Sequence, residues 1–328
     1  MRLRAAAGAV LLMAMTWCAS LAAAQTATNP PPGFKLKVDV NLVLVEAIVR
    51  DAHGGLVGNL DQGDFHVLED GVEQQVRYFS RDELPLAVAL VVDASGSMAP
   101  VLKELRQASY DATSQLKPSD QVALFDFRAR AERLEDLTTN RRRIAFDISR
   151  IHAAGATVIP DALYEAADYL GDAAPTRRHA IILISDNDNT LRGYANESRV
   201  IRRALETETV IYSIRIHGGL SYHLHHLPVL LPLFQNVSVP TIAHETGGEV
   251  MDAQDPQALH DAIATVISRL KQRYTLGYQS TNTRHDGAFR RIEIRVGPPS
   301  DQARYKVYAR QGYYAPAGEQ TAWRDTQP

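Results

Sequence analysis

Cysteine is almost absent from this 328-residue chain. The single cysteine, Cys18, lies in an apolar stretch near the amino terminus, and no other cysteine follows it. A disulfide needs two cysteines and thiol catalysis needs a retained one, so both are excluded once that stretch is removed. The lack of disulfides fits export from a bacterium.

An excess of charge and several well-known catalytic motifs are also missing. The chain has 35 Lys and Arg against 38 Asp and Glu, and its net charge of −3 offers no basic surface to nucleic acid or to an anionic membrane. It has no Gly-x-Ser-x-Gly nucleophile elbow, no Gly-x-x-x-x-Gly-Lys phosphate loop and no His-Glu-x-x-His zinc motif. The sequence therefore argues against an α/β-hydrolase, a P-loop nucleotidase and a zinc peptidase, and we expect no nucleic-acid partner.

The amino terminus has the pattern of a secretory signal. Arg2 and Arg4 precede an apolar run over residues 5–21, and three consecutive alanines end at Ala24. We expect a signal peptide over residues 1–24, cleavage near Ala24, and a periplasmic or secreted bacterial protein with no membrane insertion after cleavage. The alternative is a retained anchor, because the apolar run is just long enough to span a bilayer.

Two kinds of hydrophobic pattern divide the remaining sequence. After a proline-rich linker over residues 25–34, residues 35–83 and 274–316 alternate polar and apolar side chains, as half-exposed antiparallel strands do. Residues 84–273 alternate apolar strands with amphipathic helices, which is typical of a doubly wound, mostly parallel α/β sheet. Neither β segment is rich enough to form a sandwich alone. We therefore predict one small β-sandwich built from both, with the α/β domain inserted between them and a polar tail over residues 317–328.

Shorter signals predict individual elements. Glu69-Asp70-Gly71 between two apolar runs predicts a hairpin, because glycine accepts the positive φ that such turns need. Pro160 is suited to the first turn of a helix. We expect helices over residues 102–116, 141–151, 161–170, 198–207, 242–245 and 256–273, and strands over residues 38–49, 65–68, 74–79, 87–92, 121–127, 179–185, 210–216 and 249–251.

One stretch, AVALVVDASGSM over residues 87–98, organises the functional hypothesis. It opens as a buried strand and then places Asp93, Ser95 and Ser97 just past the carboxyl end of that strand, where open α/β sheets bind ligands. Thr157 lies in the loop before another helix, and Asp186 follows a second apolar strand. We expect the three loops to converge. Hard oxygen donors without His or Cys suit Mg²⁺ rather than Zn²⁺.

In their order and spacing, these five residues resemble the metal-ion-dependent adhesion site of the von Willebrand factor A (integrin I-like) domain. The resemblance covers roughly residues 84–273, and the flanking segments are similar to those of bacterial von Willebrand factor A-related proteins described from Acidobacteria. It implies a Rossmann-like fold and direct ligation of Mg²⁺ or Mn²⁺ by the hydroxyls of Ser95, Ser97 and Thr157. Asp93 and Asp186 would act largely through water, and the open position would take a Glu or Asp carboxylate from a protein partner.

One position departs from that family's pattern. The family usually places glycine after the last Asp, whereas this chain has Asn187 in the run Asp186-Asn187-Asp188-Asn189. Asparagine tolerates a left-handed backbone better than most residues, so we expect the turn to form. Asp188 is a secondary candidate for the metal site, and we expect it to be solvated.

The sequence leads to three functional hypotheses. We favour an exported, non-enzymatic protein that binds a partner through its metal site, in adhesion or envelope assembly. There are two alternatives. One is a metal-assisted hydrolase, which would need a general base such as Asp188 or a loop histidine. The other is a structural envelope module with a vestigial site. A histidine-rich insertion over residues 217–240 is interpreted as a surface loop rather than a transition-metal site; its histidines are His217, His223, His225 and His226. The sequence predicts neither the partner's identity nor the oligomeric state.

Overall fold

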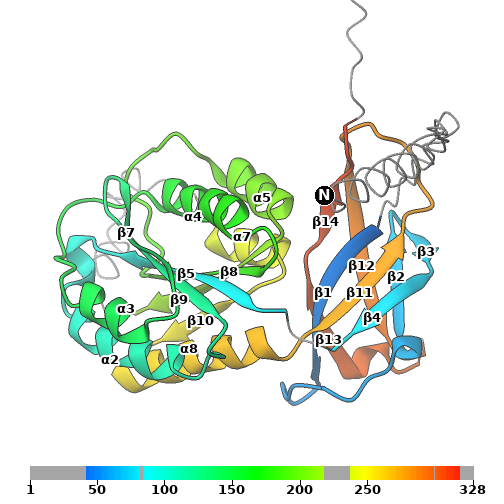
Figure 1. Ribbon diagram of the computed structural model, residues 1–328, viewed down its shortest axis with the longest axis horizontal. Coiled ribbons are helices and arrows are strands. Elements are labelled where there is room, and N and C mark those ends of the chain that lie inside the picture. Colours follow the sequence, from blue (N-terminus) through cyan, green and yellow to red (C-terminus); the bar gives the residue numbers. More distant parts are fainter. Residues whose placement is uncertain (1–41, 82–83, 218–236, 299, 318–328) are drawn as a thin grey trace, which may run out of the picture. The chain divides into compact units, whose positions relative to one another are not determined.

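A computed structural model describes residues 42–81, 84–217, 237–298 and 300–317 (Figure 1). They form one six-stranded sheet flanked by helices and two four-stranded antiparallel sheets. No helix within these ranges has the length and hydropathy needed to cross a bilayer. The predicted signal peptide, the linker and nearly all of the polar tail lie outside the described residues.

The six-stranded sheet is parallel except at one edge. The strands β5 and β8 at its centre are buried at every position, as expected where helices cover both faces of a parallel sheet. The predicted mostly parallel α/β fold is confirmed. Across the sheet the strands are β10 (Val250–Ala253), β9 (Thr209–Ile216), β8 (Arg178–Ser185), β5 (Leu86–Asp93), β6 (Gln121–Phe127) and the antiparallel β7 (Ala131–Thr138).

Helices of the described residues cover both faces of this sheet (Figure 1), and their apolar side chains form a separate cluster on each face. Pro160 lies in the first turn of α4, as predicted, and the side chains of Asn140 and Asp255 cap α3 and α8. Edge strand β7 was not predicted, because its charged sequence AERLEDLT has no period-two apolar face. The helices are α2 (Leu102–Thr113), α3 (Arg141–Ile148) and α8 (Pro256–Lys271) on one face, and α4 (Ile159–Ala173), α5 (Glu197–Glu206) and α7 (Val239–Glu245) on the other.

The two antiparallel sheets combine strands from both ends of the described chain. In one sheet β1 pairs with β11 and β13, and in the other β2 pairs with β12. Their apolar side chains share one buried cluster, which includes Val45, Val67 and Leu276. The strands are β13 (Tyr305–Ala309), β1 (Leu42–Asp51), β11 (Tyr274–Gln279) and β4 (Val76–Ser80) in the first sheet, and β14 (Gly312–Tyr314), β12 (Phe289–Val296), β2 (Phe65–Glu69) and β3 (Val72–Gln74) in the second. The domain boundaries given above stay predictions.

The predicted hairpin at residues 69–71 is present. Asp70 and Gly71 have φ of 49° and 81°, and they join β2 to β3. The single strand predicted over residues 74–79 is wrong, because the chain changes sheets there. β3 pairs with β2, whereas β4 pairs with β11 in the other sheet.

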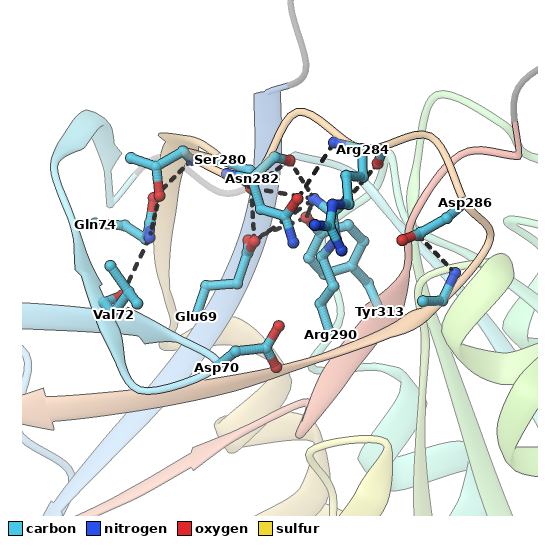
Figure 2. Close-up of polar contacts among 12 residues, drawn as sticks. Glu69, Asp70, Val72, Gln74, Ser280, Asn282, Arg284, Asp286, Arg290 and Tyr313 are labelled. Carbon is cyan, nitrogen blue, oxygen red and sulfur yellow. Dashed lines mark hydrogen bonds and ion pairs between the residues drawn. The ribbon is translucent and has the colours of Figure 1, made fainter.

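A polar cluster joins the two antiparallel sheets beside this hairpin (Figure 2). Glu69 and Arg290 are each 2% exposed, and Glu69 Oε1 lies 3.6 Å from Arg290 Nη1. Tyr278 and Tyr313 donate their hydroxyls to Glu69 Oε2 at 2.8 and 3.0 Å, and Ser280 Oγ donates to Oε1 at 2.6 Å. Hydrogen bonds therefore satisfy this buried charge on both carboxylate oxygens.

His179, at the amino-terminal end of β8, links two helix ends. Its Nδ1 lies 2.7 Å from the carbonyl oxygen of Thr207 and its Nε2 lies 2.8 Å from that of Ala174. Thr207 and Ala174 are the residues that end α5 and α4. A neutral imidazole has one N–H, so His179 can donate to one of these two carbonyls at a time. The N–H of Arg177 also donates to the Ala174 carbonyl at 2.9 Å, and Thr209 Oγ1 donates to that of Thr207 at 3.4 Å.

We expect His179→Ala to lower the free energy of unfolding by about 1–3 kcal/mol, because it removes a buried side chain together with its hydrogen bond to a helix-ending carbonyl. Urea unfolding followed by circular dichroism measures this loss. His244→Ala, at an exposed position of α7, is the matched control and should change the midpoint very little. Equal midpoints for the two variants would contradict the prediction.

Candidate metal centre

The predicted metal ligands lie at the carboxyl ends of the two central strands. β5 lies between β8 and β6, and the order of strands along the chain reverses at β5. Ligand sites of open α/β sheets occur at such a switch point. Asp93 ends β5, Asp186 directly follows β8, and Thr157 lies two residues before the start of α4.

The loop after β5 folds back on the carboxylate that precedes it. The backbone N–H of Ser95 donates to Asp93 Oδ1 at 2.8 Å. Ser95 then begins a short 3-10 turn, and its hydroxyl oxygen lies 3.0 Å from that of Ser97. The spacing of these three residues therefore places two hydroxyls and one carboxylate in a single turn.

Hydrogen bonds join this turn to the end of β8. Ser97 Oγ donates to Asp186 Oδ2 at 2.6 Å, and Ser185 Oγ donates to Asp93 Oδ2 at 2.6 Å. Four of the five predicted residues thus belong to one hydrogen-bonded cluster: Asp93, Ser95, Ser97 and Asp186. Ser185 was not among the predicted site residues.

The backbone of Thr157 is bonded to the loop after β8. Its N–H donates to Thr190 Oγ1 at 2.8 Å, and its carbonyl oxygen accepts from the N–H groups of Thr190 and Leu191 at 3.1 and 3.0 Å. The Thr157 residue is 3% exposed. The loop before α4 is therefore fixed against the loop after β8.

The same loop also contacts the turn after β5. The N–H of Ala154 donates to the carbonyl of Ala94 at 2.8 Å, and the N–H of Gly96 donates to that of Gly155 at 3.4 Å. Each of the three predicted loops is thus bonded to the other two, as the sequence predicted when it placed them at one edge of the sheet.

Among the residues that the structure describes, the groups that act most strongly on Asp93 include no cation. Burial, and then the negative charge of Asp186, raise the pKa of Asp93 to about 6 from its ordinary 3.8. Hydrogen bonds from Ser185 and Ser95 oppose this rise without cancelling it. A divalent cation placed among these oxygens would relieve the repulsion between the two carboxylates.

The donor set fits a hard cation that keeps several water ligands. Within the described ranges, no three His, Cys, Asp or Glu side chains gather in a way that could hold a metal. Binding here would therefore depend on serine and threonine hydroxyls as well as two carboxylates. Mg²⁺ and Mn²⁺ accept such oxygen ligands, whereas Zn²⁺ prefers nitrogen and sulfur.

Asn187 occupies the position where the resembling family usually has glycine. Its φ is 64°, so it adopts the left-handed backbone that we predicted asparagine would tolerate. Its side-chain oxygen accepts from Ser213 Oγ at 3.0 Å on neighbouring β9. Asp188 is half-buried, and its N–H donates to Asp186 Oδ1 at 3.1 Å. Asp188 therefore positions a predicted ligand through its backbone.

Besides Ser185, sequence reasoning missed two residues that support the site. Thr190 accepts from the N–H of Thr157, and Asn189 Oδ1 accepts from the N–H of Ile159 at 2.8 Å, at the start of α4. The available signal was the polar run that follows Asp186, since Asn and Thr side chains readily bond to nearby backbone groups.

Most of the histidine-rich insertion lies outside the described residues. Its first residue, His217, is described, and His217 Nε2 lies 2.7 Å from Asp252 Oδ1. The interpretation of this segment as a surface loop stays a prediction.

Several solved structures are similar to this chain at low sequence identity. A von Willebrand factor type A protein from Catenulispora acidiphila is similar over 84% of this chain and 62% of that chain, at 15% identity and a TM-score of 0.49. The von Willebrand factor domain of a type V pili tip protein from Porphyromonas gingivalis is similar over 57% of this chain and 95% of that chain, at 13% identity and a TM-score of 0.42. An aerotolerance-related membrane protein from Bacteroides fragilis is similar over 56% of this chain and 99% of that chain, at 15% identity and a TM-score of 0.43.

The family assignment comes from the sequence itself. No curated protein matches the chain. The family model of the von Willebrand factor type A domain, however, matches residues 88–189, which run from β5 to the loop after β8 and include all five predicted ligands. We conclude that this protein contains a von Willebrand factor type A domain.

Proposed function

We propose that the cluster at the carboxyl ends of β5 and β8 binds Mg²⁺ or Mn²⁺. The observation that carries this proposal is the hydrogen bond from Ser97, in the turn after Asp93, to Asp186. The two residues lie on different loops and are 89 positions apart. Ser95, Ser97 and Thr157 would hold the ion through their hydroxyls, and Asp93 and Asp186 would hold it largely through water. The bound ion supplies an electrophilic position for an oxygen ligand from outside the protein.

The partner in this proposal is a protein that presents a Glu or Asp carboxylate. Hydroxyl ligands are neutral, so few negative charges contact the ion directly and it keeps its attraction for a further carboxylate. Von Willebrand factor type A domains generally mediate adhesion between proteins rather than catalysis. We therefore propose a non-enzymatic role in adhesion or envelope assembly, after export and signal cleavage near Ala24.

A metal-binding test follows from the hydrogen bond between Ser97 and Asp186. We expect Ser97→Ala to weaken Mg²⁺ binding by at least about tenfold, because it removes a proposed ligand and frees the Asp186 side chain. Isothermal titration of purified protein with Mg²⁺, after treatment with EDTA, measures this change. Ser149→Ala, at an exposed serine that ends α3, is the matched control. Absence of binding heat in the native protein, or equal affinity in all three proteins, would overturn the metal proposal.

A further inference from the structure

The loop after β8 leads from the candidate metal centre to an exposed surface. We call residues 191–194 the 191–194 surface; its members are Leu191, Arg192, Gly193 and Tyr194. Leu191 is 41% exposed and Tyr194 is 51% exposed, and both are among the large apolar side chains that face solvent. Arg192 is exposed between them.

This surface begins directly beside a proposed metal ligand. The N–H of Leu191 donates to the carbonyl oxygen of Thr157 at 3.0 Å. Consecutive Cα atoms are about 3.8 Å apart, so the Cα of Tyr194 lies within about 11 Å of that of Leu191. An extended peptide advances about 3.3 Å per residue, so a carboxylate bound at the metal and about three residues next to it could cover this distance.

The backbone of the 191–194 surface is held in one conformation. The N–H groups of Tyr194 and Ala195 donate to the two carboxylate oxygens of Asp161, at 3.3 and 2.8 Å. Asp161 lies in the first turn of α4 and is 9% exposed. Gly193 packs so closely on that carboxylate that a Cβ atom would overlap it. A side chain at position 193 would therefore displace this carboxylate or the loop that it holds.

The Tyr194 side chain is also fixed although it is exposed. Its hydroxyl donates to Glu165 Oε1 at 2.7 Å, and its ring packs edge-on against Tyr164 with centroids 5.9 Å apart. Arg199 Cζ lies 5.7 Å from the Tyr194 ring centroid, and Arg199 Nη1 donates to the Tyr194 carbonyl at 2.8 Å. An aromatic side chain that is already ordered loses little entropy when a partner covers it.

Arg192 makes fewer contacts than Arg199, the neighbouring arginine. Arg199 is held by Tyr194 and Tyr164, whereas Arg192 has no hydrogen bond or ion pair with any residue that the structure describes. A guanidinium beside two exposed apolar side chains is complementary to a carboxylate that is accompanied by an apolar group.

We infer that the 191–194 surface selects the partner of the metal centre. The occupant is an acidic protein segment that carries, besides the carboxylate at the metal, an apolar or aromatic side chain for Leu191 and Tyr194 and a second carboxylate for Arg192. This inference rests on the proposed function, because the metal-bound carboxylate sets where the segment begins.

Synthetic peptides separate this inference from the proposed function. The first probe is a blocked nine-residue peptide with Glu at its centre and only Gly and Ser around it. The second is a set in which Phe and Asp are scanned over the four positions on each side of that Glu. Binding to the Mg²⁺-loaded protein is measured by nuclear magnetic resonance titration. We expect the best member of the set to bind about fivefold to tenfold more tightly than the first probe.

Two variants test which residues produce that gain. Arg192→Glu and Tyr194→Ala should each bring the affinity of the best scanned peptide close to that of the first probe. Arg142→Glu, at an exposed arginine of α3, is the control and should leave the ratio of these affinities unchanged. A first probe that binds with no gain from any scanned position, or a gain that survives both variants, overturns the inference alone. Failure of every peptide to bind in Mg²⁺ overturns the proposed function and the inference together.

Discussion

Replacing Glu69 by alanine should lower the free energy of unfolding by about 3–5 kcal/mol, because removal of one member of a buried ion pair leaves the other charge uncompensated. The charge left behind is the guanidinium of Arg290, which is 2% exposed (Figure 2). Arg290 would keep hydrogen bonds to the backbone carbonyls of Asn282 and Arg284 but would lose its carboxylate.

Glu69→Ala would also remove the acceptor of the hydroxyl groups that donate to its carboxylate. Tyr278 and Ser280 both donate to Glu69, and burial followed by this hydrogen bond raises the pKa of Tyr278 far above its ordinary range. Tyr278→Phe should therefore cost less, about 1–2 kcal/mol, because it removes one neutral donor and leaves the ion pair in place.

Urea unfolding at neutral pH measures both losses. Glu73→Ala is the matched control, since Glu73 lies on neighbouring β3 with a 66% exposed side chain that pairs with His66. It should change stability by less than about 0.5 kcal/mol. If Glu69→Ala and Glu73→Ala had the same effect, the buried cluster would not stabilise the fold as proposed.

The buried ion pair also shows which part of the fold the sequence did not predict. Phe65, Val67 and Glu69 share one face of β2, and Arg290 shares a face of β12 with Ile292. Period-two alternation thus places both charges on the core side of their strands. Their contact joins positions 221 residues apart, and β12 pairs with β2 only because the antiparallel sheets combine both ends of the described chain. The sequence predicted such a sandwich but not which strands would be neighbours within it.

The candidate metal centre was more predictable for a physical reason. Parallel strands end at one edge of a sheet, so polar residues that follow apolar strands lie close together whatever the details of the loops. That reasoning placed Asp93 and Asp186 correctly at the ends of β5 and β8. It could not find Ser185, because a serine that ends an apolar strand looks like ordinary strand sequence. The loops themselves are held by side-chain bonds to the backbone, such as that of Thr190, which have no periodic signal.

Asp93→Asn should abolish Mg²⁺ binding and yet make the metal-free protein more stable at pH 7.5. The pKa of Asp93 is about 6 in the folded protein and 3.8 in the unfolded chain. Between these values the folded protein holds a proton that the unfolded chain has lost, so stability falls as the pH rises through this window. Above pH 6 the full cost applies, and the difference between the two pKa values corresponds to about 3 kcal/mol.

Asparagine removes that cost without changing the size of the side chain. Its oxygen can still accept from the N–H of Ser95, and its amide can donate to Ser185 Oγ, which in the native protein donates to Asp93. In EDTA at pH 7.5 the variant should therefore be more stable than the native protein by up to about 3 kcal/mol, and the gain should shrink as the pH falls toward 4.

Added Mg²⁺ should reverse the order of stability at pH 7.5. The ion stabilises only a folded state that binds it, so the melting temperature of the native protein should rise with Mg²⁺ concentration while that of Asp93→Asn stays constant. Asp126→Asn is the matched control, because Asp126 is buried at the end of neighbouring β6 and burial also raises its pKa. That control should keep the response to Mg²⁺. If Asp93→Asn responded to Mg²⁺ as the native protein does, the carboxylate of Asp93 would take no part in holding the ion. If the variant were less stable than the native protein in EDTA at pH 7.5, this carboxylate would stabilise the metal-free fold.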